Sequence, residues 1–141
     1  MIRYLDTSLL VSAYTTEAKT RSVQTWLGEQ TADELAISDW VITEFSAALS
    51  IKLRTGQLDV ETRADALMLF ARFCAESTAI LPVTALHFRI AARFSDQHAL
   101  GLRAADALHL AICADHRASL FTLDAGLADA GTALGVASIL L

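Results

Sequence analysis

Short apolar segments alternate along the chain with longer segments whose apolar residues recur at helical spacing. The helical pattern is clearest in four places: from Asp39, expected to cap its helix, to Gly56; from Asp59 to Cys74; from Thr84 to Phe94; and from Arg103 to His116. Five apolar segments have the length and composition of strands, namely Ile2–Leu5, Leu35–Ile37, Ile80–Val83, Ser119–Thr122 and Val136–Leu140. Short strands between helices are typical of a parallel sheet that is buried on both faces. The pattern therefore predicts an α/β fold with a parallel sheet of about five strands sandwiched between helices.

The composition favours one folded domain over residues 1–141. Hydrophobic residues make up 54% of the chain, which excludes a disordered protein, and no Gly/Ser-rich linker interrupts it. No apolar stretch reaches the roughly 18 residues that a membrane span needs, and no signal peptide is apparent. We therefore expect a cytoplasmic protein without membrane association. Cys74 and Cys113 lack metal-type spacing and are expected to be buried free thiols.

Four acidic residues occupy similar places in this pattern. Asp6 follows the first predicted strand directly, and Asp124 follows the fourth. Glu44 and Asp106 lie in the first turns of predicted helices. Because the carboxyl ends of parallel strands, and the helix starts that follow them, meet at one edge of the sheet, we expect all four acids to lie there.

The neighbours of these acids indicate what they bind. Asp106 lies among alanines and leucines, and Glu44 has apolar residues on both sides of its helix position. A carboxylate in such surroundings needs a cation or hydrogen bonds, and only Arg103 is close in sequence to any of the four. Carboxylate oxygens suit Mg²⁺, or Mn²⁺ as a substitute. For each acid alone, helix capping or the helix dipole is an equally good explanation.

The net charge of −5 argues against an ordinary basic surface for nucleic acids. However, once the four acids are set aside, 12 acidic residues nearly balance the 11 lysines and arginines. A nucleic-acid substrate would then be held chiefly through metal and a few cations.

Four motifs resemble those of the PIN-domain family, and within it the VapC-type toxins of type II toxin–antitoxin pairs. They are YLDTSLL at residues 4–10, TEFSAAL at 43–49, LRAADALHLA at 102–111 and LFTLD at 120–124. The resemblance covers essentially the whole chain. It implies a compact α/β/α domain and a Mg²⁺- or Mn²⁺-dependent endoribonuclease that hydrolyses RNA phosphodiester bonds.

The resemblance also implies roles for individual residues. Asp6, Glu44, Asp106 and Asp124 match the family's acidic quartet, and Ser8 and Thr122 match the hydroxyl residues that accompany it. We expect Asp6 and Asp106 to be direct metal ligands and Asp124 to complete the shell. Glu44 is expected to bind a second ion or to hold a metal-bound water.

Partners and lesser residues follow the same reasoning. The family implies a homodimer and a small cognate antitoxin that covers the acidic site. Arg103, one helical turn before Asp106, is expected to contact a substrate phosphate or to pair with an acid. His109 is expected to be packed or to support the acids, and Trp26 and Trp40 to pack in the core or an interface.

Several other functions are compatible with parts of the sequence. The Asp6-Thr7-Ser8 triplet is near that of aspartic proteases, but those are β-rich and need two matched carboxylates. A non-toxin nuclease acting on DNA or in RNA processing would use the same acids. A receiver-like signalling module also gathers acids around Mg²⁺, but no lysine follows Lys52. An inactive binding domain is the remaining alternative.

Overall fold

A single five-stranded parallel sheet forms the centre of the protein. The computed structural model describes residues 1–141. The strands pair in the order β3-β2-β1-β4-β5, and every pair is parallel. Their bounds are β1 Arg3–Leu5, β2 Leu35–Ser38, β3 Ala79–Leu81, β4 Ser119–Thr122 and β5 Ser138–Leu140. The predicted α/β class and parallel sheet are thus confirmed.

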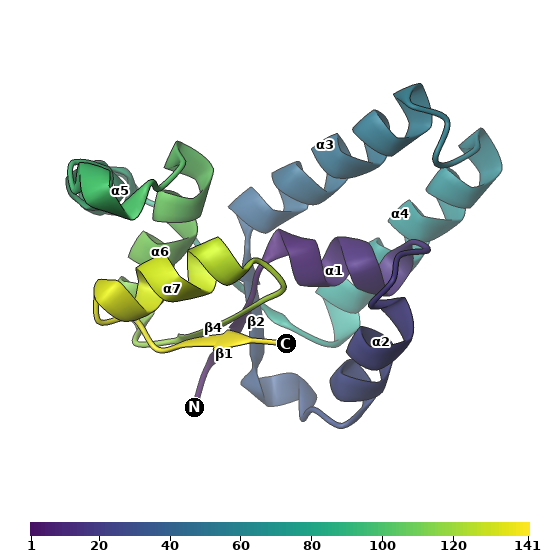
Figure 1. Ribbon diagram of the computed structural model, residues 1–141. Coiled ribbons are helices and arrows are strands. Elements are labelled where there is room, and N and C mark those ends of the chain that lie inside the picture. The colour runs from purple at the N-terminus through teal and green to yellow at the C-terminus, as the bar shows by residue number, and fades with distance from the viewer.

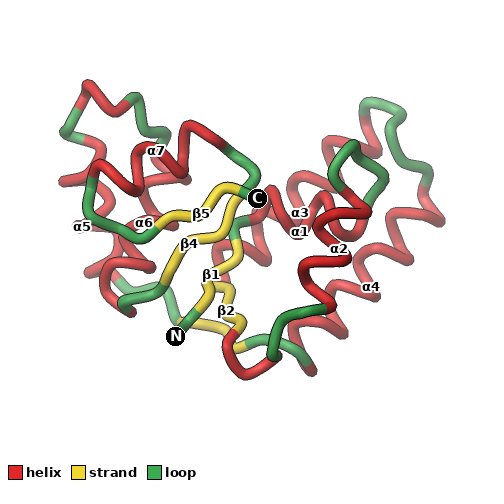
Figure 2. Tube along the Cα trace, turned by 60° about the horizontal axis from the view of Figure 1, so that its bottom comes forward, coloured by secondary structure: helices red, strands yellow, loops and turns green.

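Helices cover the sheet on both sides (Figures 1 and 2). One layer contains α1 (Thr7–Tyr14), α2 (Thr20–Gly28), α3 (Asp39–Arg54) and α4 (Val60–Glu76). The other contains α5 (Ala85–Ser95), α6 (Ala104–His116) and α7 (Ala125–Ala133). Short 3₁₀ helices span Ala32–Glu34 and His98–Leu100. The four helices expected from periodicity are all present, and none of the helices combines the length and apolarity that crossing a bilayer requires.

Side chains cap the first turns of α4 and α3. The helix predicted to begin at Asp59 does so, and Asp59 caps α4, since its carboxylate accepts the Thr62 N–H at 2.7 Å. The expected cap of α3 is wrong by one residue, because Ser38 accepts the Val41 N–H and Asp39 is the first helical residue. The reason is that β2 extends one residue further than expected, to Ser38, whose hydroxyl is then in place to cap α3.

Burial on both faces holds for the three central strands but not for the edges. Strands β1, β2 and β4 are almost wholly buried, whereas β3 and β5 are half-exposed edge strands. The predicted third strand also ends too late. Pro82 has no N–H to donate to the neighbouring strand, so β3 stops at Leu81.

The strand order places the candidate site. The chain moves outward from β1 through β2 to β3 and then returns to add β4 on the other side of β1. In such a sheet the crevice for ligands lies beyond the carboxyl ends of the strands where the order reverses, here β1 and β4. A receiver-like domain has the order 2-1-3-4-5. The observed order therefore excludes that alternative.

Aromatic packing supports the helix that carries Glu44. Phe45, the next residue, is fully buried and stacks on Phe70 of α4 with ring centroids 3.9 Å apart. Tyr14 of α1 packs edge-on against both rings. Trp26 and Trp40 also pack against the core, as expected. Both cysteines are free, but only Cys113 is buried as expected, because Cys74 is half-buried at the edge of the core. The position of α3 relative to α1 is thus set by close-packed rings.

Candidate active site

Asp6 lies at the centre of the site because β1 is the central strand. Its backbone N–H donates to the Phe121 carbonyl of β4 at 3.0 Å, which aligns the ends of the two strands. The residue is 5% exposed and precedes α1, but its side chain makes no capping hydrogen bond. The helix-capping explanation therefore fails for Asp6, whose carboxylate has other partners.

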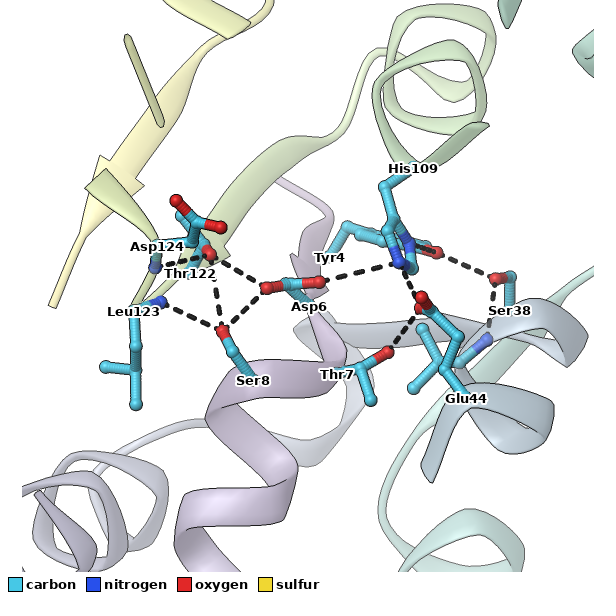
Figure 3. A network of polar contacts seen from close by, with 11 residues as sticks. Tyr4, Asp6, Thr7, Ser8, Ser38, Glu44, His109, Thr122, Leu123 and Asp124 are labelled. Atoms are coloured by element: carbon cyan, nitrogen blue, oxygen red, sulfur yellow. Dashed lines mark hydrogen bonds and ion pairs between the residues drawn. The ribbon is translucent and has the colours of Figure 1, made fainter. Parts of the chain in front are cut away.

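Two hydroxyl groups hold one oxygen of Asp6 (Figure 3). The Ser8 hydroxyl donates to Asp6 Oδ2 at 2.6 Å, and the Thr122 hydroxyl donates to the same oxygen at 2.8 Å. These hydroxyls also accept backbone N–H groups, from Leu123 at 3.2 Å and from Asp124 at 3.0 Å. The segment that follows β4 is thereby tied to the start of α1, and Asp6 is held in one orientation.

Glu44 reaches the same place from α3. Its Oε1 accepts a hydrogen bond from the Thr7 hydroxyl at 2.7 Å and a second one from His109 Nε2 of α6. His109 is 1% exposed, and its Nε2 also lies 3.5 Å from Asp6 Oδ1. One histidine N–H thus faces two of the four acids, as Figure 3 shows.

Asp106 and Asp124 line an adjacent depression of about 160 Å³. Asp106 lies in the first turn of α6, one turn before His109. Asp124 caps α7 by accepting the Leu127 N–H at 3.1 Å. Capping is thus part of what Asp124 does, although it uses only Oδ1. Arg103 lines the same depression; it is exposed and forms no ion pair with an acid.

The charges of the four acids are largely unneutralised. None of them pairs with lysine or arginine, and His109 is the only basic side chain that contacts them. Burial, and then repulsion from Asp6, Asp124 and Glu44, raises the pKa of Asp106. This influence of the other three acids on Asp106 indicates that all four share one electrostatic environment.

The Glu44–His109 pair behaves differently. Burial by itself raises the pKa of Glu44, but the hydrogen bond and charge of His109, with the Thr7 hydroxyl, lower it overall. Burial by itself lowers the pKa of His109, but Glu44 and the nearby Asp6 raise it overall. Glu44 is therefore an ionised hydrogen-bond acceptor in this site.

This donor set fits a hard divalent cation. Oxygen atoms of Asp6 and Glu44 lie within 4.8 Å of each other, with unneutralised negative charge at Asp106 and Asp124 beside them. Crowded carboxylates without a lysine or arginine are stabilised by a cation, and oxygen ligands favour Mg²⁺ or Mn²⁺. The roles of the individual acids as ligands remain predictions.

A second group of potential ligands, His87, Asp115 and His116, lies where α5 packs on α6. Its hydrogen bonds do not suit a metal. His87 Nδ1 accepts the Thr84 N–H at 3.0 Å, so Nε2 carries the proton of the neutral ring and donates to Asp115 Oδ2 at 2.9 Å. A protonated nitrogen has no lone pair for a metal, and this group links the two helices instead.

Comparison with known proteins identifies the fold. The family profile of the PIN domain matches residues 3–132. The chain belongs to the PIN-domain family. The resemblance inferred from the four motifs is therefore confirmed at the family level. No curated protein sequence matches the chain.

Solved structures share this PIN-domain fold over their full length. FitAcB from Neisseria gonorrhoeae is 20% identical, with a TM-score of 0.72 over 98% of this chain and 96% of that chain. VapC20 from Mycobacterium tuberculosis, a toxin that cleaves the sarcin-ricin loop, is 15% identical, with a TM-score of 0.75 over 99% of both chains. VapBC-5 of the same organism, from the VapBC family of toxin–antitoxin systems, is 19% identical, with a TM-score of 0.63 over 99% and 98%. At these identities the likeness establishes the fold.

The structure adds residues that sequence reasoning did not select. Tyr4 and Ser38 are fully buried and hydrogen-bond to each other at 2.7 Å, and Tyr4 also contacts His109 Nδ1 at 2.9 Å. Thr7 was passed over although it adjoins Asp6. A hydroxyl inside an otherwise apolar strand was the available signal for Tyr4, because a buried hydroxyl needs a partner.

Proposed function

We propose that this PIN domain is a Mg²⁺-dependent endoribonuclease, with Mn²⁺ as a substitute, and the toxin of a toxin–antitoxin pair. The observation that carries the proposal is the gathering of four carboxylates at the β1/β4 edge with no lysine or arginine paired to any of them. Such a cluster is unfavourable without a cation, so it is explained best by a function that uses one.

The proposed chemistry is hydrolysis of a phosphodiester bond. A divalent cation, when bound, lowers the pKa of a water molecule and offsets the charge of the phosphate. Asp6, Asp106 and Asp124 would hold the cation through carboxylate oxygens. Glu44, ionised and fixed by Thr7 and His109, would orient the attacking water or accept its proton.

Arg103 is the proposed contact for a substrate phosphate. It lies at the rim of the depression lined by Asp106 and Asp124, and its guanidinium is not engaged by an acid. A guanidinium donates two parallel hydrogen bonds to phosphate oxygens. With few other cations near the acids, RNA affinity would depend on this residue and on the bound cation.

The proposed partners are a small antitoxin and a second copy of the chain. The similarity to toxins and to toxin–antitoxin complexes supports an antitoxin. Large apolar side chains remain exposed on α4 and α5, including Met68, Leu69, Leu86 and Phe88. Exposed apolar residues of this size are available for such interfaces.

The central test is Asp6→Asn, which removes the charge and keeps the shape. The purified variant should cleave RNA at least about 100-fold more slowly than the wild type in Mg²⁺, because the cation loses a ligand. Asp129→Asn, on the exposed face of α7, is the matched control and should cleave normally. EDTA should stop the wild-type reaction, and added Mg²⁺ or Mn²⁺ should restore it.

Three outcomes would contradict parts of this proposal. If Asp6→Asn, with its fold verified by circular dichroism, cleaved RNA at the wild-type rate, Asp6 would not belong to the catalytic site. Cleavage in EDTA would argue against metal chemistry, and equal cleavage of a DNA of the same sequence would favour the alternative of a general nuclease. Expression that leaves bacterial growth unaffected would argue against a toxin.

A further inference from the structure

A chain of four hydrogen bonds, three of them buried, runs from the start of α3 to Glu44 (Figure 3). The Val41 N–H donates to Ser38 Oγ at 3.4 Å, and Ser38 Oγ lies 2.7 Å from the Tyr4 hydroxyl. That hydroxyl lies 2.9 Å from His109 Nδ1, and His109 Nε2 contacts Glu44 Oε1. The three side chains between the ends are at most 1% exposed, so bulk water does not compete for the bonds among them.

The direction of the chain follows from its last member. His109 Nε2 faces Glu44 Oε1 and, at 3.5 Å, Asp6 Oδ1. Ionised carboxylates only accept hydrogen bonds, so a bare nitrogen lone pair in this place would oppose oxygen lone pairs. Nε2 must therefore carry a proton.

The remaining protons are then assigned in order. In the neutral ring Nδ1 is an acceptor, so the Tyr4 hydroxyl donates to it. The Tyr4 oxygen accepts from the Ser38 hydroxyl, and Ser38 accepts from the Val41 N–H. Each hydroxyl in the chain gives one hydrogen bond and receives one. The opposite direction would leave Ser38 without an acceptor among these groups.

We propose that His109 is a positioning residue that donates to Glu44 and is not a metal ligand, and that Tyr4 and Ser38 hold it in this state. This proposal rests on the proposed metal site. His109 Nε2 lies within 4.8 Å of Asp6 and Glu44 oxygens, so distance alone would admit it as a ligand. Both of its ring nitrogens are already engaged, one by Glu44 and the other by the Tyr4 hydroxyl, and this assigns it a supporting role instead.

Two consequences follow for the metal site. Glu44 Oε1 is occupied by His109 and Thr7, which leaves Oε2 as the oxygen that Glu44 offers to the cation or its water. The protein ligands at the β1 edge are then oxygen atoms only. An oxygen-only set favours Mg²⁺ and Mn²⁺ over Zn²⁺, which readily takes imidazole nitrogen.

The first test observes His109 directly by ¹⁵N NMR of the histidine-labelled, metal-free wild-type protein, at a pH where the ring is neutral. His109→Gln assigns the signals by their loss. The expected signature is the Nε2–H tautomer, unchanged on addition of Mg²⁺. An Nδ1–H tautomer, or loss of the Nε2 proton on adding Mg²⁺, would overturn the proposal. This readout does not involve cleavage, so it stands or fails separately from the proposed ribonuclease activity.

The second test removes the support of the histidine. Tyr4→Phe keeps the ring and deletes the hydroxyl, and Tyr14→Phe is the matched control outside the chain. We expect Tyr4→Phe to show a mixture of His109 tautomers and an apparent Kd for Mn²⁺ raised about 10-fold, with the control unchanged. Wild-type tautomer and affinity in folded Tyr4→Phe would overturn the role of Tyr4.

A pair of substitutions at His109 separates donation from simple packing. The amide nitrogen of Gln can replace the Nε2–H donor, whereas Leu fills the space without donating. His109→Gln should therefore bind Mn²⁺ at least about 3-fold more tightly than His109→Leu. Equal affinities of the two folded variants would contradict a donor role, and wild-type affinity in both would contradict any positioning role.

Discussion

Replacing Asp106 by Asn is expected to stabilise the metal-free protein while removing its response to metal. Ionisation of Asp106 is unfavourable in the folded protein, because burial and the neighbouring acids raise its pKa. Each unit of such a shift corresponds to about 1.4 kcal/mol. The first turn of α6 offsets part of the penalty, since a carboxylate there gains about 0.3–1 kcal/mol from the helix dipole. After a discount for partial exposure, we expect Asp106→Asn to raise the free energy of unfolding by about 1 kcal/mol at pH 7.5 in EDTA.

The pH dependence has a definite sign. A carboxyl whose folded pKa is raised destabilises the folded protein when it is ionised, so the penalty is complete above the folded pKa. As the pH falls through that value the folded protein takes up the proton first, and the penalty is gone below the unfolded pKa of about 3.9. The difference in unfolding free energy between Asp106→Asn and the wild type should therefore be largest near neutral pH and should disappear as the pH approaches 3.

Metal should narrow the difference in unfolding free energy between the two proteins. At a free Mg²⁺ concentration ten times its Kd, the wild type should gain about 1.4 kcal/mol. Asp106→Asn should gain less than half of that amount. Urea unfolding followed by the fluorescence of Trp26 and Trp40 measures all four values, with Asp129→Asn as the control. An Asp106→Asn protein that is less stable than the wild type in EDTA would refute the idea that the acids repel one another without a cation.

Two further substitutions test the substrate contact and the packing behind the site. Arg103→Ala should weaken binding of single-stranded RNA to the Asp6→Asn protein and reduce the slope of log K against log salt by about 0.7, as filter binding at several salt concentrations would show; an unchanged slope would exclude a phosphate contact. Gly131→Ala should lower the free energy of unfolding by about 1–3 kcal/mol, because a Cβ there would lie 2.1 Å from Ser138 Oγ and 2.9 Å from Leu110 Cδ2. Thermal unfolding measures this loss, and Ser138→Ala should recover part of it; a fully stable Gly131→Ala protein would show that β5 shifts freely.

The positions of the acids were predictable because each depends on local sequence alone. Asp6 and Asp124 follow apolar strands, and Glu44 and Asp106 lie in the first two turns of helices with clear periodicity. A parallel sheet then brings strand ends and helix starts together without any knowledge of side-chain contacts. The periodicity of α3 to α6 was sufficient for the same reason, since each buries a distinct apolar face.

What was missed depends on contacts between distant residues or on weak local signals. Tyr4 hydrogen-bonds to Ser38, 34 residues away, and to His109, 105 residues away. The apolar segment around Tyr4 does not indicate which residues these partners are. Helix α2 was not predicted because it is short and its apolar stripe consists only of Val23, Trp26 and Leu27. The exposure of β3 and β5 follows from their places at the edges of the sheet. The sequence pattern predicts where strands occur but not the order in which they pair.

The strand order also bears on how the protein is made. Asp6 and Glu44 precede β3 in the chain, whereas Asp106 and Asp124 follow it, and β4 joins β1 only after residue 119 has been added. A polypeptide still leaving the ribosome therefore carries half of the carboxylates and lacks the strand that aligns them. Under the proposed function, a chain that has not reached Asp124 cannot attack the messenger from which it is being translated, and cleavage begins only after β4 has been added.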